Sequence, residues 1–272
     1  MRELSSACNG RSDCGTLIFG SQLWAKPEVD GSADSPMSQQ IPPALYTAST
    51  WVIPLVIAIT FHEASHGYVA RLFGDDTAWR LGRVSFNPFK HIDLFGTVLL
   101  PALLLLMRSP FLFGYAKPVP VNFQALRNPR RDSIWVAAAG PAMNLALATV
   151  AALALHLLIF LSDAARPWVA ENLQNALIIN VLLAIFNLLP LPPLDGGRIA
   201  VGVLPDTLAS PLARLEPYGM MILIAVLFIL PVLGAQLGID LNFVWHLVQR
   251  ATNLIIDAIL WLTGNAMLGE PA

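Results

Sequence analysis

The residues best suited to chemistry form the sequence His62-Glu63-Ala64-Ser65-His66 inside a long apolar stretch. Residues four apart lie on one face of a helix, so His62 and His66 can aim both imidazoles at a single ion. Glu63 follows the first histidine, where its carboxylate can take a proton from a water bound to that ion. The alternative is a packed helix in which the two histidines bond each other or a backbone carbonyl. Ionisable side chains in an apolar span are costly and mark functional sites, which favours the metal.

Such a site needs a third ligand, and Asp195 is the best candidate. Three prolines lie within residues 190–193, and Gly196 and Gly197 follow the aspartate. Backbone broken in this way is tolerated at membrane depth only where protein or a water-filled cavity satisfies it, so this segment is suited to line a cavity. The other interpretation is a turn residue at a helix end. Two histidines and a carboxylate suit Zn²⁺ better than Ca²⁺ or Mg²⁺, and the sequence predicts one Zn²⁺ per chain.

Two asparagines, Asn144 and Asn187, are uncharged polar residues in otherwise apolar predicted helices. Either side chain can hydrogen-bond a substrate carbonyl or stabilise an oxyanion. Either can equally bond a neighbouring helix, and the sequence leaves both roles open.

The composition requires a membrane protein. Of 272 residues, 56% are hydrophobic and 12% are charged, whereas soluble domains contain about 25% charged residues. The net charge is −2 and no basic stripe is present, so we expect no nucleic-acid partner. The fold class predicted is an all-α polytopic bundle in the lipid bilayer with five to six transmembrane helices, for which the candidate spans are 47–72, 134–161, 174–194, 218–235 and 243–263.

The chain divides into a flexible polar tail at 1–45, a membrane-embedded domain at 46–265 and a short tail at 266–272. The length of the apolar segment 94–107 and its proline suit a re-entrant or interfacial element better than a full span, and the sequence leaves open whether it crosses the bilayer. Residues 71–133 hold nine of the sixteen Lys and Arg residues. The positive-inside rule places that region in the cytoplasm, and the predicted site in the cytoplasmic half of the bilayer.

Three motifs in this order resemble the site-2 protease family of intramembrane zinc metalloproteases, in its compact form without a PDZ or CBS domain: His62-Glu63-x-x-His66, Gly140-Pro141-x-x-Asn144 and Asn187-x-x-Pro190-x-x-Pro193-x-Asp195-Gly196. The segment Phe113–Asn122 is also similar to the compact bacterial and archaeal members. The resemblance implies zinc held by His62, His66 and Asp195, with Glu63 activating water. It also implies membrane-spanning protein substrates, regulated intramembrane proteolysis and location in a bacterial or archaeal plasma membrane.

The stretch Lys117–Asn122 is too rich in proline for a helix. We predict an extended or β-hairpin edge that pairs with an unwound substrate by strand addition. The alternatives are a non-catalytic scaffold that retains the protease fold and a metal transporter. A scaffold has no need of a base at Glu63, and the later spans hold too few acidic or His residues for a polar path. The sequence also allows a homo-oligomer.

Overall fold

A computed structural model describes residues 42–91, 93, 99, 103, 106 and 117–265. All the regular secondary structure in this part of the chain is helical, and it contains no strand, so the predicted all-α class is confirmed. Most of the predicted tail 1–45 and of the segment 94–107 lies outside the described residues. The tail 266–272 and residues 113–116 lie outside them entirely.

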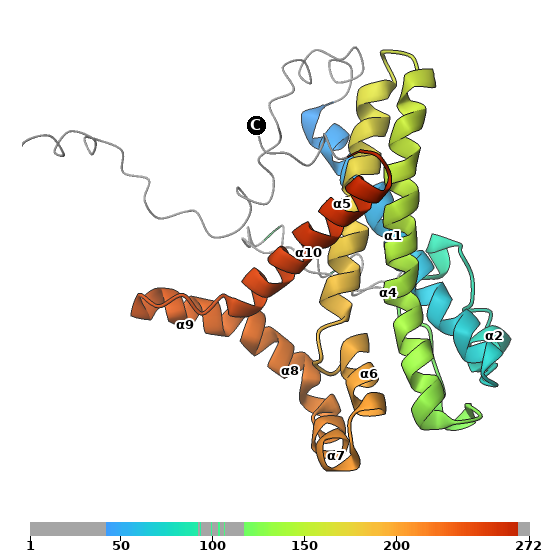
Figure 1. Cartoon of the computed structure of the whole chain (residues 1–272), viewed down its shortest axis with the longest axis vertical. Coiled ribbons are helices and arrows are strands. Elements are labelled where there is room, and N and C mark those ends of the chain that lie inside the picture. The colour runs from blue at the N-terminus through green and yellow to red at the C-terminus, as the bar shows by residue number, and fades with distance from the viewer. Residues whose placement is uncertain are drawn as a thin grey trace, which may run out of the picture.

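Three long helices pack side by side and form the centre of the molecule (Figure 1). They are α1 (Pro43–Leu72), α4 (Pro129–Ala154) and α5 (Arg166–Asn187). Each has a proline in its first turn, where the missing backbone N–H would have had no partner. A 3-10 turn, η5 (Leu155–Phe160), continues α4.

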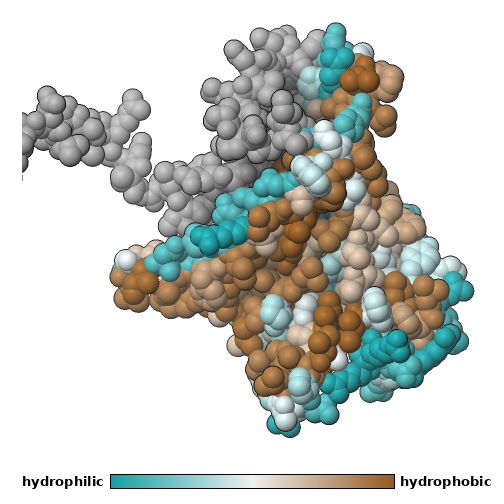
Figure 2. Space-filling view, viewed as in Figure 1, coloured by the Kyte–Doolittle hydropathy of each residue, from teal (hydrophilic) through white to brown (hydrophobic). Residues whose placement is uncertain are grey.

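Within the described residues, four helices are long and apolar enough to cross a membrane: Leu45–Leu72, Pro129–Phe160, Arg166–Asn187 and Asp206–Leu237. The last comprises α7 (Asp206–Arg214), η6 (Glu216–Tyr218), α8 (Gly219–Ile224), the π-helical η7 (Ala225–Ile229) and α9 (Leu230–Leu237). Large apolar side chains such as Val150, Leu157 and Ile159 are exposed on these helices. Their gathering over the helix surfaces (Figure 2) suits contact with lipid.

The predicted span 174–194 was wrong at its end, because α5 stops at Asn187. The residues that follow are apolar, but the prolines at 190, 192 and 193 remove helix hydrogen bonds and turn the chain. The turned segment leads into the short helix α6 (Asp195–Val203), which begins at the predicted third ligand.

The predicted span 243–263 is a helix, α10 (Phe243–Leu262), but it is not among the four apolar ones. Its exposed residues His246, Arg250, Asn253 and Asp257 recur every three or four positions and form one polar stripe. Figure 2 shows this hydrophilic stripe along the visible face of the helix. A count of five to six spans therefore stays a prediction.

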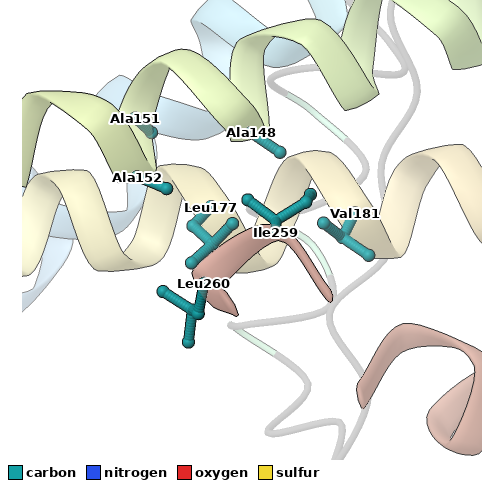
Figure 3. Packing of buried hydrophobic residues seen from close by; sticks show 7 residues of the cluster. All are labelled: Ala148, Ala151, Ala152, Leu177, Val181, Ile259 and Leu260. Atoms are coloured by element: carbon teal, nitrogen blue, oxygen red, sulfur yellow. The ribbon is translucent and has the colours of Figure 1, made fainter. Parts of the chain in front are cut away.

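The largest buried apolar cluster joins α4, α5 and α10 (Figure 3). Helix α4 contributes three alanines, which allow the backbones to approach closely, and the other helices fill the space with larger side chains. The members are Ala148, Ala151, Ala152, Leu177, Val181, Ile259 and Leu260. This packing fixes α4 and α5 relative to each other, and α1 packs against both.

The connection between α1 and α4 carries short elements: α2 (Thr77–Arg80), η2 (Pro88–Lys90) and η4 (Phe123–Ala125). It begins at Gly74, whose φ of +109° few other residues adopt. The stretch 117–122 ahead of η4 is neither helix nor strand. It lies against α1 at Glu63, as described below.

Candidate active site

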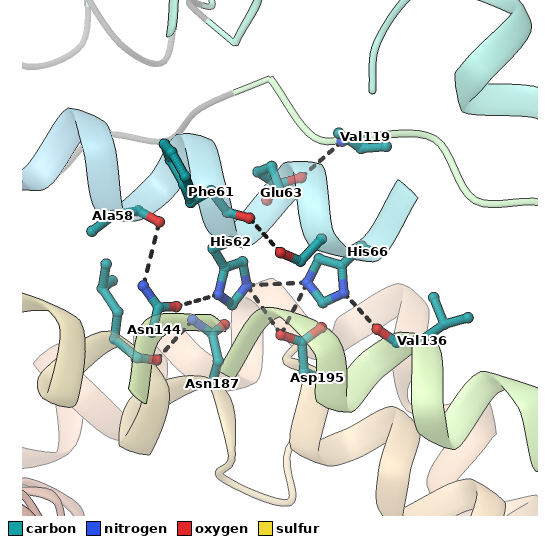
Figure 4. Close-up of polar contacts among 12 residues, drawn as sticks. Ala58, Phe61, His62, Glu63, His66, Val119, Val136, Asn144, Asn187 and Asp195 are labelled. Carbon is teal, nitrogen blue, oxygen red and sulfur yellow. Dashed lines mark hydrogen bonds and ion pairs between the residues drawn. The ribbon is translucent and has the colours of Figure 1, made fainter. Parts of the chain in front are cut away.

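Helix α1 and the start of α6 bring three potential metal ligands together (Figure 4). The Nε2 atoms of His62 and His66 lie 3.1 Å apart. Oδ2 of Asp195 lies 3.2 Å from the first of these atoms and 3.4 Å from the second. Two atoms bound to one tetrahedral zinc at about 2.0–2.1 Å lie about 3.3 Å apart. The three separations therefore suit a single zinc ion.

Hydrogen bonds to α4 fix the orientation of both imidazoles. Nδ1 of His66 lies 2.7 Å from the carbonyl oxygen of Val136, and Nδ1 of His62 lies 2.5 Å from Oδ1 of Asn144. Both oxygens only accept, so in the neutral rings the protons are on Nδ1 and the lone pairs on Nε2. Oδ2 of Asp195 is buried and accepts no hydrogen bond of good geometry. Three electron-pair donors that face one another in this way could hold a metal ion.

The side chain of Asn144 is fully buried and every hydrogen on it is used. Its Nδ2 donates to the carbonyl oxygen of Ala58 at 3.3 Å and to Oδ1 of Asn180 at 2.8 Å. The amide of Asn180 is itself fixed, because it donates to the carbonyl oxygen of Ala176 at 2.8 Å. Oδ1 of Asn144 must therefore face His62. Of the two roles left open by the sequence, this geometry favours bonding to neighbouring helices over contact with substrate.

Gly140 is the point of closest approach between α4 and the two histidines. A Cβ atom there would lie 2.5 Å from Cε1 of His62 and 2.5 Å from Nε2 of His66. Val136, Gly140 and Asn144 are spaced four apart on one face of α4, opposite the pair on α1. This face of α4 thus supplies two hydrogen-bond acceptors, at Val136 and Asn144. Gly140 between them leaves the space that the two imidazoles occupy.

Two glycines let Asp195 reach the histidines. The loop after α5 folds back on the first turn of α6, where a Cβ at Gly196 would collide with the backbone carbonyl of Leu188. A Cβ at Gly197 would lie 2.5 Å from the backbone nitrogen of Pro192. The Asp-Gly-Gly sequence therefore permits a close chain reversal, and the aspartate side chain points from it toward α1 (Figure 4).

Glu63 lines the same cavity as the three ligands, with a volume of about 370 Å³. Its Oε2 accepts a hydrogen bond from the backbone N–H of Val119 at 2.8 Å. This bond attaches the extended stretch 117–122 to α1. Gly67, one turn further along α1, allows the approach, because a Cβ there would lie 3.0 Å from Cγ1 of Val119.

Both ends of the stretch 117–122 are anchored. The buried carboxylate of Asp75 accepts from the backbone N–H of Asn122 at 2.6 Å. Nη2 of Arg83 donates to the carbonyl oxygens of Lys117 at 3.0 Å and Pro118 at 3.4 Å. Sequence reasoning missed Asp75, Arg83 and Asn180. The available signals were an acid three residues after the end of α1 and a further asparagine two turns before Asn187.

Asn187 is the last residue of α5 and lines the cavity with the three ligands. Its Nδ2 donates to the carbonyl oxygen of Leu183 at 3.0 Å, within its own helix. Its other amide hydrogen and Oδ1 have no partner among the described residues, so this side chain can bond a molecule in the cavity.

The fold and site define a helical protein with membrane-spanning helices and a group of two histidines and an aspartate that could hold a metal ion, with a glutamate beside it. The chain matches the model of peptidase family M50 over residues 50–163 and 156–230. It is 38% identical over 188 residues to YwhC of Bacillus subtilis (strain 168), covering 66% of this chain and 80% of that protein. It is 30% identical over 180 residues to Rip2 of Mycolicibacterium smegmatis, covering 66% of each. It is 28% identical over 207 residues to Rip2 of Mycobacterium tuberculosis, covering 74% of this chain and 76% of that protein.

All three relatives carry the provisional name of zinc metalloprotease. No solved structure matches the chain. The chain belongs to peptidase family M50, the site-2 protease family, and the resemblance seen in its motifs is confirmed. It is an integral membrane zinc metalloprotease.

Proposed function

We propose that His62, His66 and Asp195 hold the zinc ion and that Glu63 is the general base for peptide-bond hydrolysis. The observation that carries this proposal is the meeting of three buried ligand atoms within 3.4 Å of one another, with both histidine Nδ1 atoms bonded elsewhere. The nearby carboxylate lines the same cavity.

The residues of the chain then have distinct tasks. The three ligands would hold a zinc ion, which would act as a Lewis acid and lower the pKa of a water molecule to about 7. Glu63 takes a proton from the water that adds to the scissile carbonyl, and gives a proton to the amine as the C–N bond breaks. The Val119 N–H holds the Glu63 carboxylate in place. Asn187 lies where it can bond the substrate carbonyl, whereas Asn144 acts as a positioning residue for His62.

The substrates we propose are membrane-spanning helices of other proteins, cut in the cytoplasmic half of a bacterial or archaeal plasma membrane. His66 lies less than two turns from the end of α1, where Arg71, Arg80 and Arg83 follow. The described loop residues there form a hydrophilic end of the molecule beside the apolar helices (Figure 2). That basic end supports a cytoplasmic location under the positive-inside rule, and the relatives named above are bacterial. Release of a cytosolic fragment, as in regulated intramembrane proteolysis, would follow from such a cut.

A helical substrate hides its carbonyl groups, so it must unwind before cleavage. We propose that the unwound segment pairs with the stretch 117–122 by strand addition. The stretch runs along the cavity beside Glu63, and Val121 lines the cavity while its backbone makes no hydrogen bond to another described residue. Its N–H and C=O are therefore available to a substrate.

Val121→Pro tests this pairing, because it removes one N–H while leaving the bonds of Val119 and Asn122 in place. We expect cleavage to fall by about tenfold, the worth of one hydrogen bond, with zinc content unchanged. Val121→Ala is the control, since it keeps the N–H. Equal cleavage by the proline and alanine variants would exclude pairing at this residue.

Glu63→Gln tests the catalytic assignment. The wild type and the variant would be purified in detergent, analysed for zinc, and incubated with a panel of single-pass helices. We expect about one zinc per chain in both proteins and cleavage by the wild type alone. Cleavage by the variant at the wild-type rate would remove Glu63 from the mechanism. Zinc binding without cleavage by either protein would favour the scaffold.

A further inference from the structure

A second pocket of about 220 Å³ adjoins the cavity that holds the candidate ligands. The two share Phe123, Pro193 and Arg198 as lining residues, so they lie directly side by side. Arg198 follows Asp195 by three positions on α6 and is therefore its neighbour on the helix surface. A substrate chain with a carbonyl group in the cavity beside Asp195 would pass Arg198 to reach the second pocket.

The walls of this second pocket are apolar. Pro129, Pro192, Val201 and Ala213 line it, together with the ring of Phe123. A polar group buried among such side chains without a partner is destabilised, so the walls select apolar groups.

The polar groups at the edge of the pocket already have partners. Ser133 Oγ donates to the carbonyl oxygen of Arg130 at 2.9 Å. The Arg198 guanidinium lies 4.4 Å from the centre of the Phe123 ring and donates to Glu216 at 2.6 Å. Each polar side chain of the lining thus already has a partner within the protein. The pocket is also smaller than the about 300–1,000 Å³ typical of sites for whole small molecules.

We propose that this pocket binds one apolar side chain of the substrate, from a residue close to the bond that is cleaved. The assignment rests on the proposed function, since the occupant is the same chain whose carbonyl enters the catalytic cavity. The shared wall of the two pockets supports it, as do the mainly apolar lining and a volume of side-chain size. The enzyme then selects its cleavage site by the size of one substrate side chain that fits this pocket.

The test uses the full-length protein and single-pass helix substrates in which each residue flanking the mapped cleavage site is changed in turn to Ala, Leu or Phe. A hydrophobic pocket discriminates one methylene by about 10–200-fold. We expect the wild type to prefer Leu over Ala at one position by at least about tenfold in kcat/KM. Ala213→Leu, at an exposed helix position, should fill the pocket and remove that preference by slowing cleavage of the Leu substrate alone.

Ala146→Leu is the matched control, because it makes the same change at an exposed position on α4 that does not line the pocket. Val201→Ala enlarges the pocket and should shift the preference from Leu toward Phe. An unchanged Leu-to-Ala ratio in Ala213→Leu and an unchanged profile in Val201→Ala would overturn this inference while leaving the proposed function intact. Absence of zinc-dependent cleavage by the wild type would instead overturn the proposed function, and the inference with it.

Discussion

Adding a single methyl group at Gly140 should disable the zinc site. The Cβ of Gly140→Ala would lie 2.5 Å from atoms of both imidazoles. Favourable carbon contacts lie at about 3.5–4.0 Å, so the overlap is about 1 Å at each ring. Neither ring can yield freely, because each is tied by Nδ1 to α4 itself, at Val136 on one side of Gly140 and Asn144 on the other.

The magnitude follows from how metal sites respond to displaced ligands. Losing one supporting hydrogen bond costs about 10–100-fold in metal affinity, and a displacement of 1 Å costs about 100-fold in rate. Because Gly140→Ala disturbs two ligands together, we expect zinc affinity to fall by about 100-fold. Cleavage at limiting zinc should fall at least as much.

The assay is zinc content per chain after equilibration with a series of competing chelators, measured beside cleavage. Gly202→Ala is the control, because its Cβ would also be crowded, by the Ile134 side chain and the backbone carbonyl oxygen of Arg130, but away from the candidate ligands. Wild-type zinc affinity in Gly140→Ala would refute the argument that α4 and the histidines are packed at their closest limit.

Further predictions concern the residues that support the site. Asn180→Ala should weaken zinc binding by about tenfold, because the amide of Asn144 loses a partner and holds His62 less firmly. The control Asn253→Ala, on the exposed stripe of α10, should leave zinc binding unchanged. Equal zinc affinities of Asn180→Ala and the wild type would contradict this support of His62 through Asn144. Asp75→Ala should lower cleavage by about tenfold with zinc retained, since the backbone N–H of Asn122 loses its buried acceptor; loss of zinc in parallel would point to general unfolding. Stripping zinc with a chelator should abolish cleavage, and adding zinc but not magnesium should restore it; activity that persists in chelator would exclude a metalloprotease.

The sequence was sufficient to select the three candidate ligands that the structure brings together, because their signals are local. The spacing of His62 and His66 is that of one helix turn, and Asp195 stands out because prolines and glycines surround it. The supporting residues have no such pattern. Asp75 bonds a backbone group 47 positions away, and Asn144 bonds a side chain 36 positions away. The first pair meets within the connection between α1 and α4, and the second is brought together by the packing of α4 against α5. Spacing along the sequence does not reveal either contact.

The ends of the predicted spans show a similar contrast between overall composition and individual residues. Apolar content alone extends the helix past Asn187, whereas the prolines that follow end it there. In α10 the apolar content is high enough to suggest a span, but the order of His246, Arg250, Asn253 and Asp257 gives the helix a polar side. The fold class thus follows from composition, while helix ends depend on individual residues and their order.

The central claim is that His62, His66 and Asp195 together hold one zinc ion, and zinc X-ray absorption on the purified wild type and Asp195→Ala tests it most directly. We predict one zinc per wild-type chain, with nitrogen and oxygen ligands at about 2.0–2.2 Å and no sulfur. In Asp195→Ala the zinc content should fall sharply at the same chelator concentration. A zinc content and first coordination shell that are identical in the two proteins would contradict the account.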